Sequence, residues 1–180
     1  NAIHLDAKPG KDGHWQALDG GDIITEKEYE NFDFTYEWKI GNCGNSGVMF
    51  NVVEADKYDY VWKTGPEMQV LDNTCHPDSR FVTHRAGDLY DLIACKYPTV
   101  RPAGEWNEAR IKSNKGNVEF WLNGINVVNF TMHDDNWRKM VAKSKFKDMP
   151  DFGKAKGGHL SLQDHGDRVW FRNLKIRELK

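Results

Sequence analysis

A row of polar side chains near the carboxyl end of the chain has the pattern of a ligand-binding strand. In the stretch HLSLQ (159–163), leucines occupy the even positions and polar residues the odd ones. Side chains on a β-strand point alternately to its two faces, so leucines that enter a core leave the polar residues on the opposite face. His165 continues the polar parity. We expect Gln163 and His165 to lie in a cleft, and Asp164 to be a partner or a turn residue.

A second polar pair lies in the stretch PEMQVLD (66–72). Glu67 and Gln69 share one strand face there, and two apolar residues occupy the other. A carboxylate on a ligand-facing strand can act as a general base or bind a metal. The alternative is that Glu67 is a surface carboxylate or an ion-pair partner. Asp72 has the opposite parity, and we expect its side chain to shape the following turn through hydrogen bonds.

The rest of the chain consists mostly of short alternating segments that must position these residues. The stretch DFTYEWKI (33–40) places four large apolar side chains on one face, as a half-buried strand does. Further strands are expected at 48–53, 106–113, 117–122, 125–130 and 167–179, a turn at 41–47, a tight hairpin turn at Asn123-Gly124 and one short helix at 135–143. Many strands with almost no helix predict one all-β domain over residues 1–180, an antiparallel sandwich of two sheets with a concave face.

Composition excludes several classes of protein. Hydrophobic residues make up 39% of the 180 residues and charged ones 29%, as in globular proteins that are not disordered. The formal net charge is −2 with no basic cluster, which argues against nucleic-acid binding. No apolar run reaches membrane-spanning length. The chain begins at Asn1 without a visible signal segment, which fits a mature or trimmed form.

The cysteines leave the compartment open. Cys43, Cys75 and Cys95 are an odd number with wide spacing, so they cannot all pair within one chain, and the spacing does not resemble a zinc site. Either one disulfide or three buried thiols is consistent with this pattern. The oligomeric state cannot be deduced from the sequence.

Eight blocks, in order, give the chain a family resemblance. They are EYENFDFTYEWKI, GNSGVMF, GPEMQVLDN, HRAGDLYDL, PAGEWNEARI, VEFWLNG, SKF and GGHLSLQDHGDRVWFRNLKIREL. With these blocks the chain resembles the 3-keto-disaccharide hydrolase family. One departure is at the start, where the family has a segment like LFDGKSLDGW and this chain has HLDAKPGKDGHW (4–15). We therefore expect the first strand to be divergent or cut.

The resemblance implies a concanavalin-like jelly-roll sandwich that binds carbohydrate and acts on oxidised glycosides in the periplasm or outside the cell. A ketone at carbon 3 of a sugar acidifies the hydrogen on carbon 2, so a base can remove that proton and the oxygen on carbon 1 can leave. Water addition then completes a net hydrolysis. This route needs a base, an acid and a group that stabilises the enolate, namely a cation, hydrogen-bond donors or a divalent metal. Direct hydrolysis would instead need paired carboxylates. No organic cofactor is expected.

The catalytic candidates are Glu67 and His165, because an imidazole, with an ordinary pKa of ~6.5, titrates near neutral pH. The substrate-binding candidates are Gln69, Gln163, Asn45, Ser46, Arg85, Tyr90, Trp106, Trp62 and His84. For the aromatic rings the alternative is core burial, for Asn45 and Ser46 it is completion of a turn, and for His84 and Arg85 it is a place in a rim loop.

Two other classes of function remain open from the sequence. The same sandwich serves non-catalytic lectin-like modules, since a fold does not fix a function. A structural or interaction domain of a polysaccharide-use system is the third possibility. A binding module needs aromatic rings and amides but no acid–base pair. Glu67 and His165 in one cleft would therefore favour the enzyme.

Overall fold

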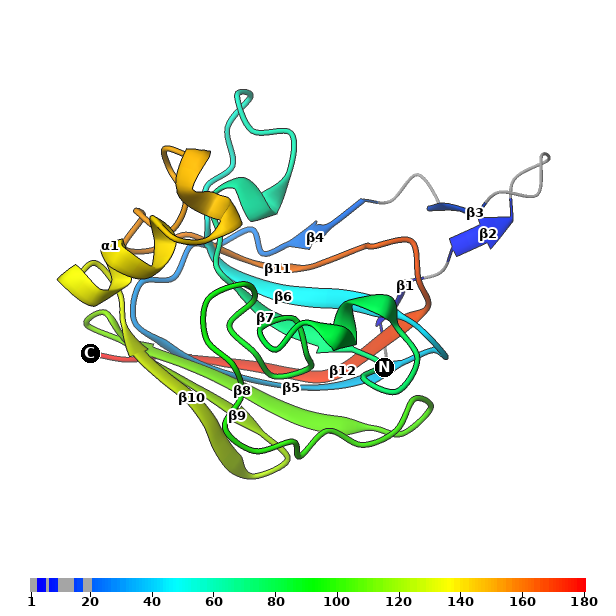
Figure 1. Cartoon of the computed structure of the whole chain (residues 1–180). Coiled ribbons are helices and arrows are strands. Elements are labelled where there is room, and N and C mark those ends of the chain that lie inside the picture. The colour runs from blue at the N-terminus through cyan, green and yellow to red at the C-terminus, as the bar shows by residue number, and fades with distance from the viewer. Residues whose placement is uncertain (1–2, 6, 10–14, 18–20) are drawn as a thin grey trace.

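The computed structural model describes residues 3–5, 7–9, 15–17 and 21–180, with side chains from residue 21 onward. The described strands form two stacked antiparallel sheets (Figure 1), which confirms the expected all-β sandwich. The six-stranded sheet has the order β1 (Ile3–Leu5), β12 (Val169–Glu178), β5 (Phe32–Ile40), β8 (Asn107–Asn114), β9 (Asn117–Leu122) and β10 (Ile125–Thr131). The four-stranded sheet has the order β4 (Ile23–Ile24), β11 (His159–Leu162), β6 (Asn45–Val52) and β7 (Glu67–Leu71). A separate pair consists of β2 (Ala7–Pro9) and β3 (Trp15–Ala17).

The core between the two sheets follows the predicted alternation. In β5 the even positions from Phe32 to Ile40 are all buried, and the leucines of β11, Leu160 and Leu162, are buried with them in the same cluster. Each large apolar side chain removed from water contributes about 2 kcal/mol. Because Leu160 and Leu162 are anchored in the core, the odd positions of β11 must face away from the six-stranded sheet.

The hairpin turns are set by backbone conformation. Asn123 and Gly124 have φ of 51° and 81°, as the two central residues of a type I′ turn require, and β9 and β10 pair on either side of them. This confirms the predicted tight turn. A similar turn at Lys115 and Gly116 joins β8 to β9.

The turn predicted at 41–47 is too long. Strand β6 begins at Asn45, which pairs with Leu71 of β7. Just before it, Cys43 forms a disulfide with Cys75, and the Asp72 carboxylate accepts the backbone N–H of Cys43 at 2.9 Å. Of the two alternatives that the sequence left open, one disulfide or three buried thiols, the structure has the single disulfide. Asp72 also binds the Thr74 hydroxyl and backbone, so it shapes the turn as expected.

The first strand can be compared with expectation only in part, because residues 6 and 10–14 of the segment 4–15 lie outside the described residues. The backbone of β1 pairs with β12, with Ile3 opposite Phe171.

Long connections cover the outer face of the four-stranded sheet (Figure 1). One contains the 3-10 turn η1 (Val61–Lys63), the next contains η2 (Pro77–Arg80), and the last contains helix α1 (Asp135–Val141) and η3 (Lys145–Asp148). No helix in the described part of the chain is long and apolar enough to span a membrane.

Helix α1 is fixed at both its start and its side. The Asp134 side chain caps it by accepting the backbone N–H of Trp137 at 2.7 Å, a common N-cap arrangement. The buried Trp137 ring stacks on Phe130 of β10 at 5.6 Å and on Phe152 at 6.3 Å between ring centroids. Phe146 of η3 stacks on the same Phe152 at 3.8 Å. The aromatic stack therefore holds η3 in place over the sheet.

Candidate functional site

A cavity of about 390 Å³ lies on the outer face of the four-stranded sheet. Its volume falls within the range of about 300–1,000 Å³ that is usual for small-molecule sites. It is lined by Asn45, Trp62, Glu67, Gln69, Tyr90, Lys145, Phe146, Met149, Gln163 and His165. The floor comes from β6, β7 and the end of β11. The walls come from the connections that contain η1 and η3 and from the segment around Tyr90. Seven of the eleven residues predicted for the site thus line one cavity.

Strand pairing brings the floor residues together. Gly47 of β6 pairs with Gln69 of β7, and the backbone N–H of Gln163 donates to the Gly47 carbonyl at 2.9 Å. Since neighbouring strands lie about 4.8 Å apart, these bonds place side chains from β7 and β11 on either side of Gly47. The predicted parity is the reason why Glu67, Gln69 and Gln163 all face the cavity.

Gly47 makes room for the Glu67 side chain. A Cβ atom at position 47 would lie 2.0 Å from Oε1 of Glu67 and 2.6 Å from its Cδ, closer than non-bonded atoms can approach. A glycine, which has no Cβ, allows another group to approach the backbone closely. In the structure the Glu67 side chain takes that space.

Burial controls the protonation of Glu67. Its exposed fraction is 8%, and removal from water raises the pKa of this carboxyl from 4.5 to about 8, although the nearby Lys145 ammonium acts in the opposite direction. The Gln69 amide nitrogen, in the orientation that satisfies its neighbours, donates to Oε1 of Glu67 at 2.7 Å and to the Ser46 carbonyl at 3.1 Å. Glu67 is therefore an oriented group with a pKa near the middle of the biological range, which suits proton transfer.

Lys145 lines the cavity together with Phe146 and Met149, and the sequence reasoning named none of the three for the site. The Lys145 ammonium lies over the Tyr90 ring, 4.0 Å from the centroid, and partial burial lowers its pKa. Its backbone N–H donates to Asp91 at 2.8 Å, and the preceding Ser144 caps η3 through the Phe146 N–H at 3.1 Å. The short block SKF contained this signal, but a loop lysine has no strand parity that would place it.

The Tyr90 wall is held by a cluster behind it. The backbone N–H of Tyr90 donates to the Glu67 carbonyl at 3.0 Å. The segment around Tyr90 therefore continues the sheet past β7. The His84 ring packs against the Tyr90 ring at a tilt of 34°, with 4.3 Å between centroids. It also contacts Asp91 at 3.0 Å and Asp78 at 3.6 Å. His84, predicted to bind substrate, does not line the cavity. It lies behind Tyr90 instead.

The polar row that ends β11 divides into two parts. Gln163 is buried, and its Oε1 has no hydrogen-bond partner among the described residues. His165 is exposed at the rim of the same cavity. His159, further back, bonds to the Thr25 carbonyl through Nδ1 at 2.6 Å, and Ser161 is fully covered. Only the end of the row is accessible to a ligand. Asp164 bonds to the N–H of Gly166 at 3.0 Å, as expected for a turn residue.

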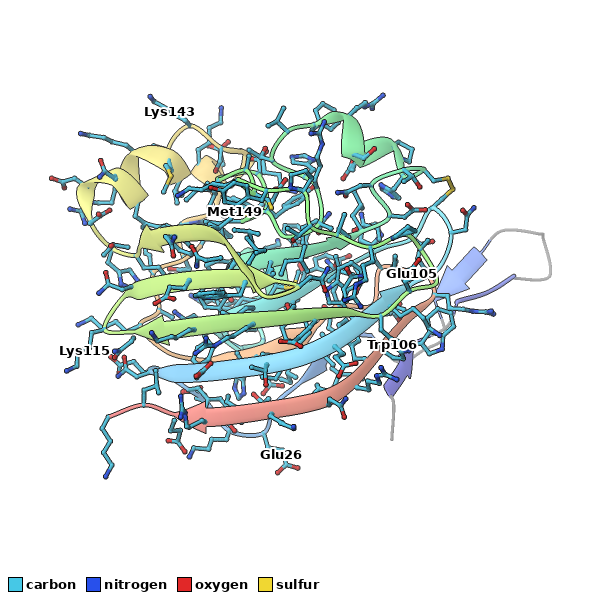
Figure 2. The ribbon with its side chains drawn as sticks, turned by 90° about the horizontal axis from the view of Figure 1, so that it is seen from below. Glu26, Glu105, Trp106, Lys115, Lys143 and Met149 are labelled. Carbon is cyan, nitrogen blue, oxygen red and sulfur yellow. A yellow bond between two sulfur atoms is a disulfide. The ribbon has the colours of Figure 1, made fainter. Side chains whose placement is uncertain are left out.

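Three predicted binding residues lie elsewhere. Ser46 has the core-facing parity of β6 and donates its hydroxyl to the Gln163 carbonyl at 2.9 Å. Arg85 lies in a loop and donates through Nε to the Ser79 carbonyl at 2.7 Å. The Arg172 guanidinium lies over the Trp106 ring, 3.8 Å from the ring centroid. Figure 2 shows Trp106 at one end of β8, away from Met149 of the cavity.

Metal ligation was left open by the sequence. Across residues 21–180, whose side chains are described, no group of three or more His, Cys, Asp or Glu side chains is arranged to hold a metal ion. The donors that face the cavity are one carboxyl, one imidazole and three amides, from Glu67, His165, Asn45, Gln69 and Gln163. A divalent metal stays one of the alternatives for stabilising the enolate, as it was from the sequence, and Glu67 and His165 are the titratable donors it would meet here.

Comparison with known proteins relates the whole chain to one family. Residues 5–177 match the 3-keto-alpha-glucoside-1,2-lyase-like domain. The chain is 34% identical over 188 aligned residues to a 3-keto-disaccharide hydrolase of Bacteroides thetaiotaomicron. The alignment covers 93% of this chain and 65% of that relative. It therefore spans just under two thirds of that protein.

Solved structures agree with this relationship. A Parabacteroides distasonis protein assigned as a glycosyl hydrolase superposes with a TM-score of 0.85 at 35% identity, covering 92% of this chain and 78% of that one. A carbohydrate-binding module from Bacillus subtilis shares the fold alone, with a TM-score of 0.58 at 11% identity and coverage of 98% and 95%. The family match over nearly every residue and the ordered blocks lead to one conclusion: the chain belongs to the 3-keto-alpha-glucoside-1,2-lyase-like domain family.

Proposed function

We propose that this domain cleaves the glycosidic bond of 3-keto-glycosides by elimination followed by hydration, with the oxidised sugar bound in the cavity over β6, β7 and β11. The observation that carries the proposal is the presence of Glu67, His165 and Lys145 in one cavity. A lectin-like module would need the amides and aromatic rings found there, but not a buried carboxyl with a pKa of about 8. The names of the relatives point to the same class of substrate.

The proposed reaction has two stages. In the first, the base takes the proton from carbon 2, the C–H electron pair forms an enolate with the carbon 3 ketone, and the bond from carbon 1 to the glycosidic oxygen then breaks. The leaving oxygen takes a proton from the acid, which gives an alcohol and an enone. In the second stage, water adds across the enone double bond and yields the free 3-keto sugar.

Glu67 is the proposed base. A carboxylate with a raised pKa is a stronger base than an ordinary one, and a carbon acid next to a ketone requires this strength. Gln69 fixes one of its oxygens through the 2.7 Å hydrogen bond, and Gly47 leaves the side chain its space. Both contacts hold the carboxyl where it can reach a sugar carbon above the sheet.

Lys145 and Gln163 are proposed to act on the sugar oxygens. The Lys145 ammonium supplies a positive charge inside a partly buried cavity, where it stabilises an enolate oxygen more strongly than it could in water. The Gln163 amide oxygen is a buried acceptor to which no group in the described part of the chain donates, and a sugar hydroxyl would satisfy it. His165 at the rim is the proposed acid for the leaving oxygen. A divalent metal, when bound, would polarise the carbon 3 carbonyl.

The disulfide suggests the compartment. Disulfides persist in oxidising environments such as the periplasm or the cell exterior, and Cys43 and Cys75 are paired. We therefore propose a periplasmic or secreted location for this domain.

The activity can be tested directly with a 3-keto-α-glucoside that carries a chromogenic aglycon. We expect the aglycon to be released from this compound and not from the unoxidised glucoside, with and without chelator and added Mg²⁺ or Mn²⁺ as parallel arms. Glu67→Gln should lower kcat by about 10³-fold without changing the fold as judged by circular dichroism. If no 3-keto compound is cleaved in any arm, but sugars still bind, the lectin-like alternative replaces the enzyme.

Isotope exchange separates elimination from direct hydrolysis. A substrate deuterated at carbon 2 should react several-fold more slowly, and the product formed in D₂O from ordinary substrate should contain deuterium at carbon 2. Retention of the original hydrogen at that carbon, with no rate difference, would show that carbon 1 is attacked directly.

A further inference from the structure

The Asp91 carboxylate joins two segments that carry cavity residues. Its Oδ2 accepts the backbone N–H of Lys145 at 2.8 Å, and its Oδ1 contacts Nε2 of His84 at 3.0 Å. The His84 ring packs against the Tyr90 ring, and the Lys145 ammonium lies 4.0 Å from the centroid of that same ring. These four residues form a closed set of contacts, in which Asp91 reaches Lys145 both directly and through the two rings.

The backbone of Asp91 has an uncommon conformation. Its φ is 59°, in the left-handed region that few residues other than glycine adopt, although aspartate adopts it more readily than most. The Asp91 N–H donates to the Thr83 carbonyl at 2.9 Å, and the Asp91 side chain is 21% exposed. Such conformations persist where the surrounding contacts impose them, and they are frequent at functional sites. The carboxylate is therefore held in one direction, toward His84 and the start of η3.

The contact with Asp91 also orients the His84 ring. An ionised carboxylate can only accept hydrogen bonds, so Nε2 of His84 donates to Asp91. Nδ1 faces the Asp78 carboxylate at 3.6 Å and has no hydrogen-bond partner in the part of the chain that the structure describes. The Tyr90 hydroxyl donates to the same Asp78 carboxylate at 3.4 Å. His84 is thus oriented by Asp91, and its ring in turn supports Tyr90.

Lys145 needs this support because its side chain is long. An ammonium on a flexible four-carbon stem can occupy many positions, whereas an enolate oxygen is stabilised by a charge that is already in place. Lys145 is the first residue of η3, and its charge interacts with those of Glu67, Asp91 and Asp78. The bond from Asp91 is made to the backbone of residue 145 itself, so it fixes the point from which this side chain extends.

We propose that Asp91 and His84 are positioning residues for the reaction: Asp91 fixes the backbone of Lys145, and the two together fix the aromatic ring over which its ammonium lies. This inference rests on the proposed function, in which Lys145 stabilises the enolate oxygen. Neither Asp91 nor His84 lines the cavity, so both act through Lys145 and Tyr90 and not on the sugar.

Two substitutions at Asp91 separate position from charge. We expect Asp91→Ala to lower kcat on a 3-keto-α-glucoside by about 10- to 10²-fold with little change in KM, since a small displacement of a catalytic group can cost this much. Asp91→Asn should retain most of the activity, because its amide can accept the Lys145 N–H and donate to His84. An equal loss in the two variants would overturn the proposal.

A double-mutant cycle shows whether Asp91 acts through Lys145. In a Lys145→Met background, Asp91→Ala should cause little further loss of kcat, because the ammonium that Asp91 positions is already absent. A full additional loss in that background would contradict the proposal.

Asp134→Ala is the matched control for loosening of the connection between β10 and β11. Asp134 also anchors this connection by accepting a backbone N–H, that of Trp137 at 2.7 Å, and it does not line the cavity. The substitution should leave kcat unchanged. A loss as large as that of Asp91→Ala would exclude a specific role for Asp91.

The pKa of Glu67 gives a readout that does not depend on turnover. Burial raises this pKa most, Lys145 lowers it, and Asp22 and Asp78 raise it further. In Asp91→Ala, displacement of the ammonium should therefore raise the pKa of Glu67, whereas loss of the Asp91 charge alone would lower it. An NMR titration of the Glu67 carboxyl distinguishes these two signs, and a lower or unchanged pKa would overturn the proposal.

The titration also separates this proposal from the proposed function. If no 3-keto compound is cleaved, the proposed function fails, and the pKa of Glu67 in Asp91→Ala still decides whether Asp91 positions Lys145. If Asp91→Ala does not fold, His84→Ala tests the indirect route alone, because it leaves the bond from Asp91 to the Lys145 N–H in place. It should raise the pKa of Glu67 by a smaller amount, and an unchanged value would overturn the role of His84.

Discussion

The protonation of Glu67 determines how the site responds to pH. Its side chain is almost completely buried, and its pKa is about 8 in the fold against an ordinary value of 4.5. The proposed base is therefore mostly protonated at neutral pH in the free protein. If it acts as proposed, kcat/KM should increase with pH up to about 8, because the free enzyme must lose this proton first.

The same shift predicts a pH dependence of stability. A carboxyl whose pKa is raised on folding favours the folded state at low pH, and this contribution is lost as the pH rises from about 4.5 to about 8. The free energies of unfolding of the native protein and of Glu67→Gln should therefore differ increasingly over this range, and the variant should gain on the order of 5 kcal/mol relative to the native protein. A constant difference between pH 5 and pH 9 would contradict the raised pKa.

Lys145 allows a second test on a single residue. Lys145→Met should lower kcat by about 10²-fold, the usual effect of removing one charged stabiliser of a developing oxyanion. It should also move the pH–rate profile to higher pH, because the ammonium lowers the pKa of Glu67. Lys147→Met is the matched control, since both lysines are exposed in the same 3-10 turn and only Lys145 lines the cavity. Equal effects of the two substitutions would exclude a specific role for Lys145.

At the scale of elements, the site depends on the close pairing of β6 and β7. Gly47→Ala would bring a methyl group to within 2.0 Å of the Glu67 carboxyl, so we expect Glu67 to shift and kcat to decrease at least about 10²-fold. Stability should also fall, and Gly47→Ala/Glu67→Ala should recover part of the loss because it removes the clash. A double-mutant cycle in thermal unfolding measures this coupling, and strictly additive effects would argue against the contact.

Strand parity is the property that made much of the site predictable. Alternation placed Glu67, Gln69 and Gln163 on one face, and pairing across β6, β7 and β11 then brought them together. Boundaries were less predictable: a turn was predicted over 41–47, but β6 begins at Asn45 within that range, and Ser46 consequently faces the core.

Residues outside the alternating pattern were missed or misplaced. Lys145 is positioned by a helix cap and an aromatic stack, which carry no periodic signal. Trp106 shows the opposite error, because an aromatic residue next to a strand does not reveal which of the two sheets it will face.

For the whole molecule, the disulfide joins the segments at the ends of β6 and β7. It links residues 32 positions apart, and a loop of that length should contribute about 3–4 kcal/mol by restricting the unfolded chain. We expect Cys43→Ser/Cys75→Ser to lower Tm by on the order of 10 °C, and reductant to have a similar effect on the native protein. Cys95→Ser is the control, since Cys95 is not paired. Insensitivity of Tm to both treatments would mean that the bridge does not stabilise the fold.

The room that Gly47 leaves for Glu67 has a consequence for the dynamics of catalysis. The carboxyl packs directly on the backbone of the adjacent strand and is held by the Gln69 amide, so few other rotamers are available to it. A group restricted in this way needs little reorganisation when the sugar arrives, and its charge is already oriented before the reaction begins. Crystal structures without and with sugar should accordingly show the same χ angles for Glu67, while the side chains of the surrounding loops differ.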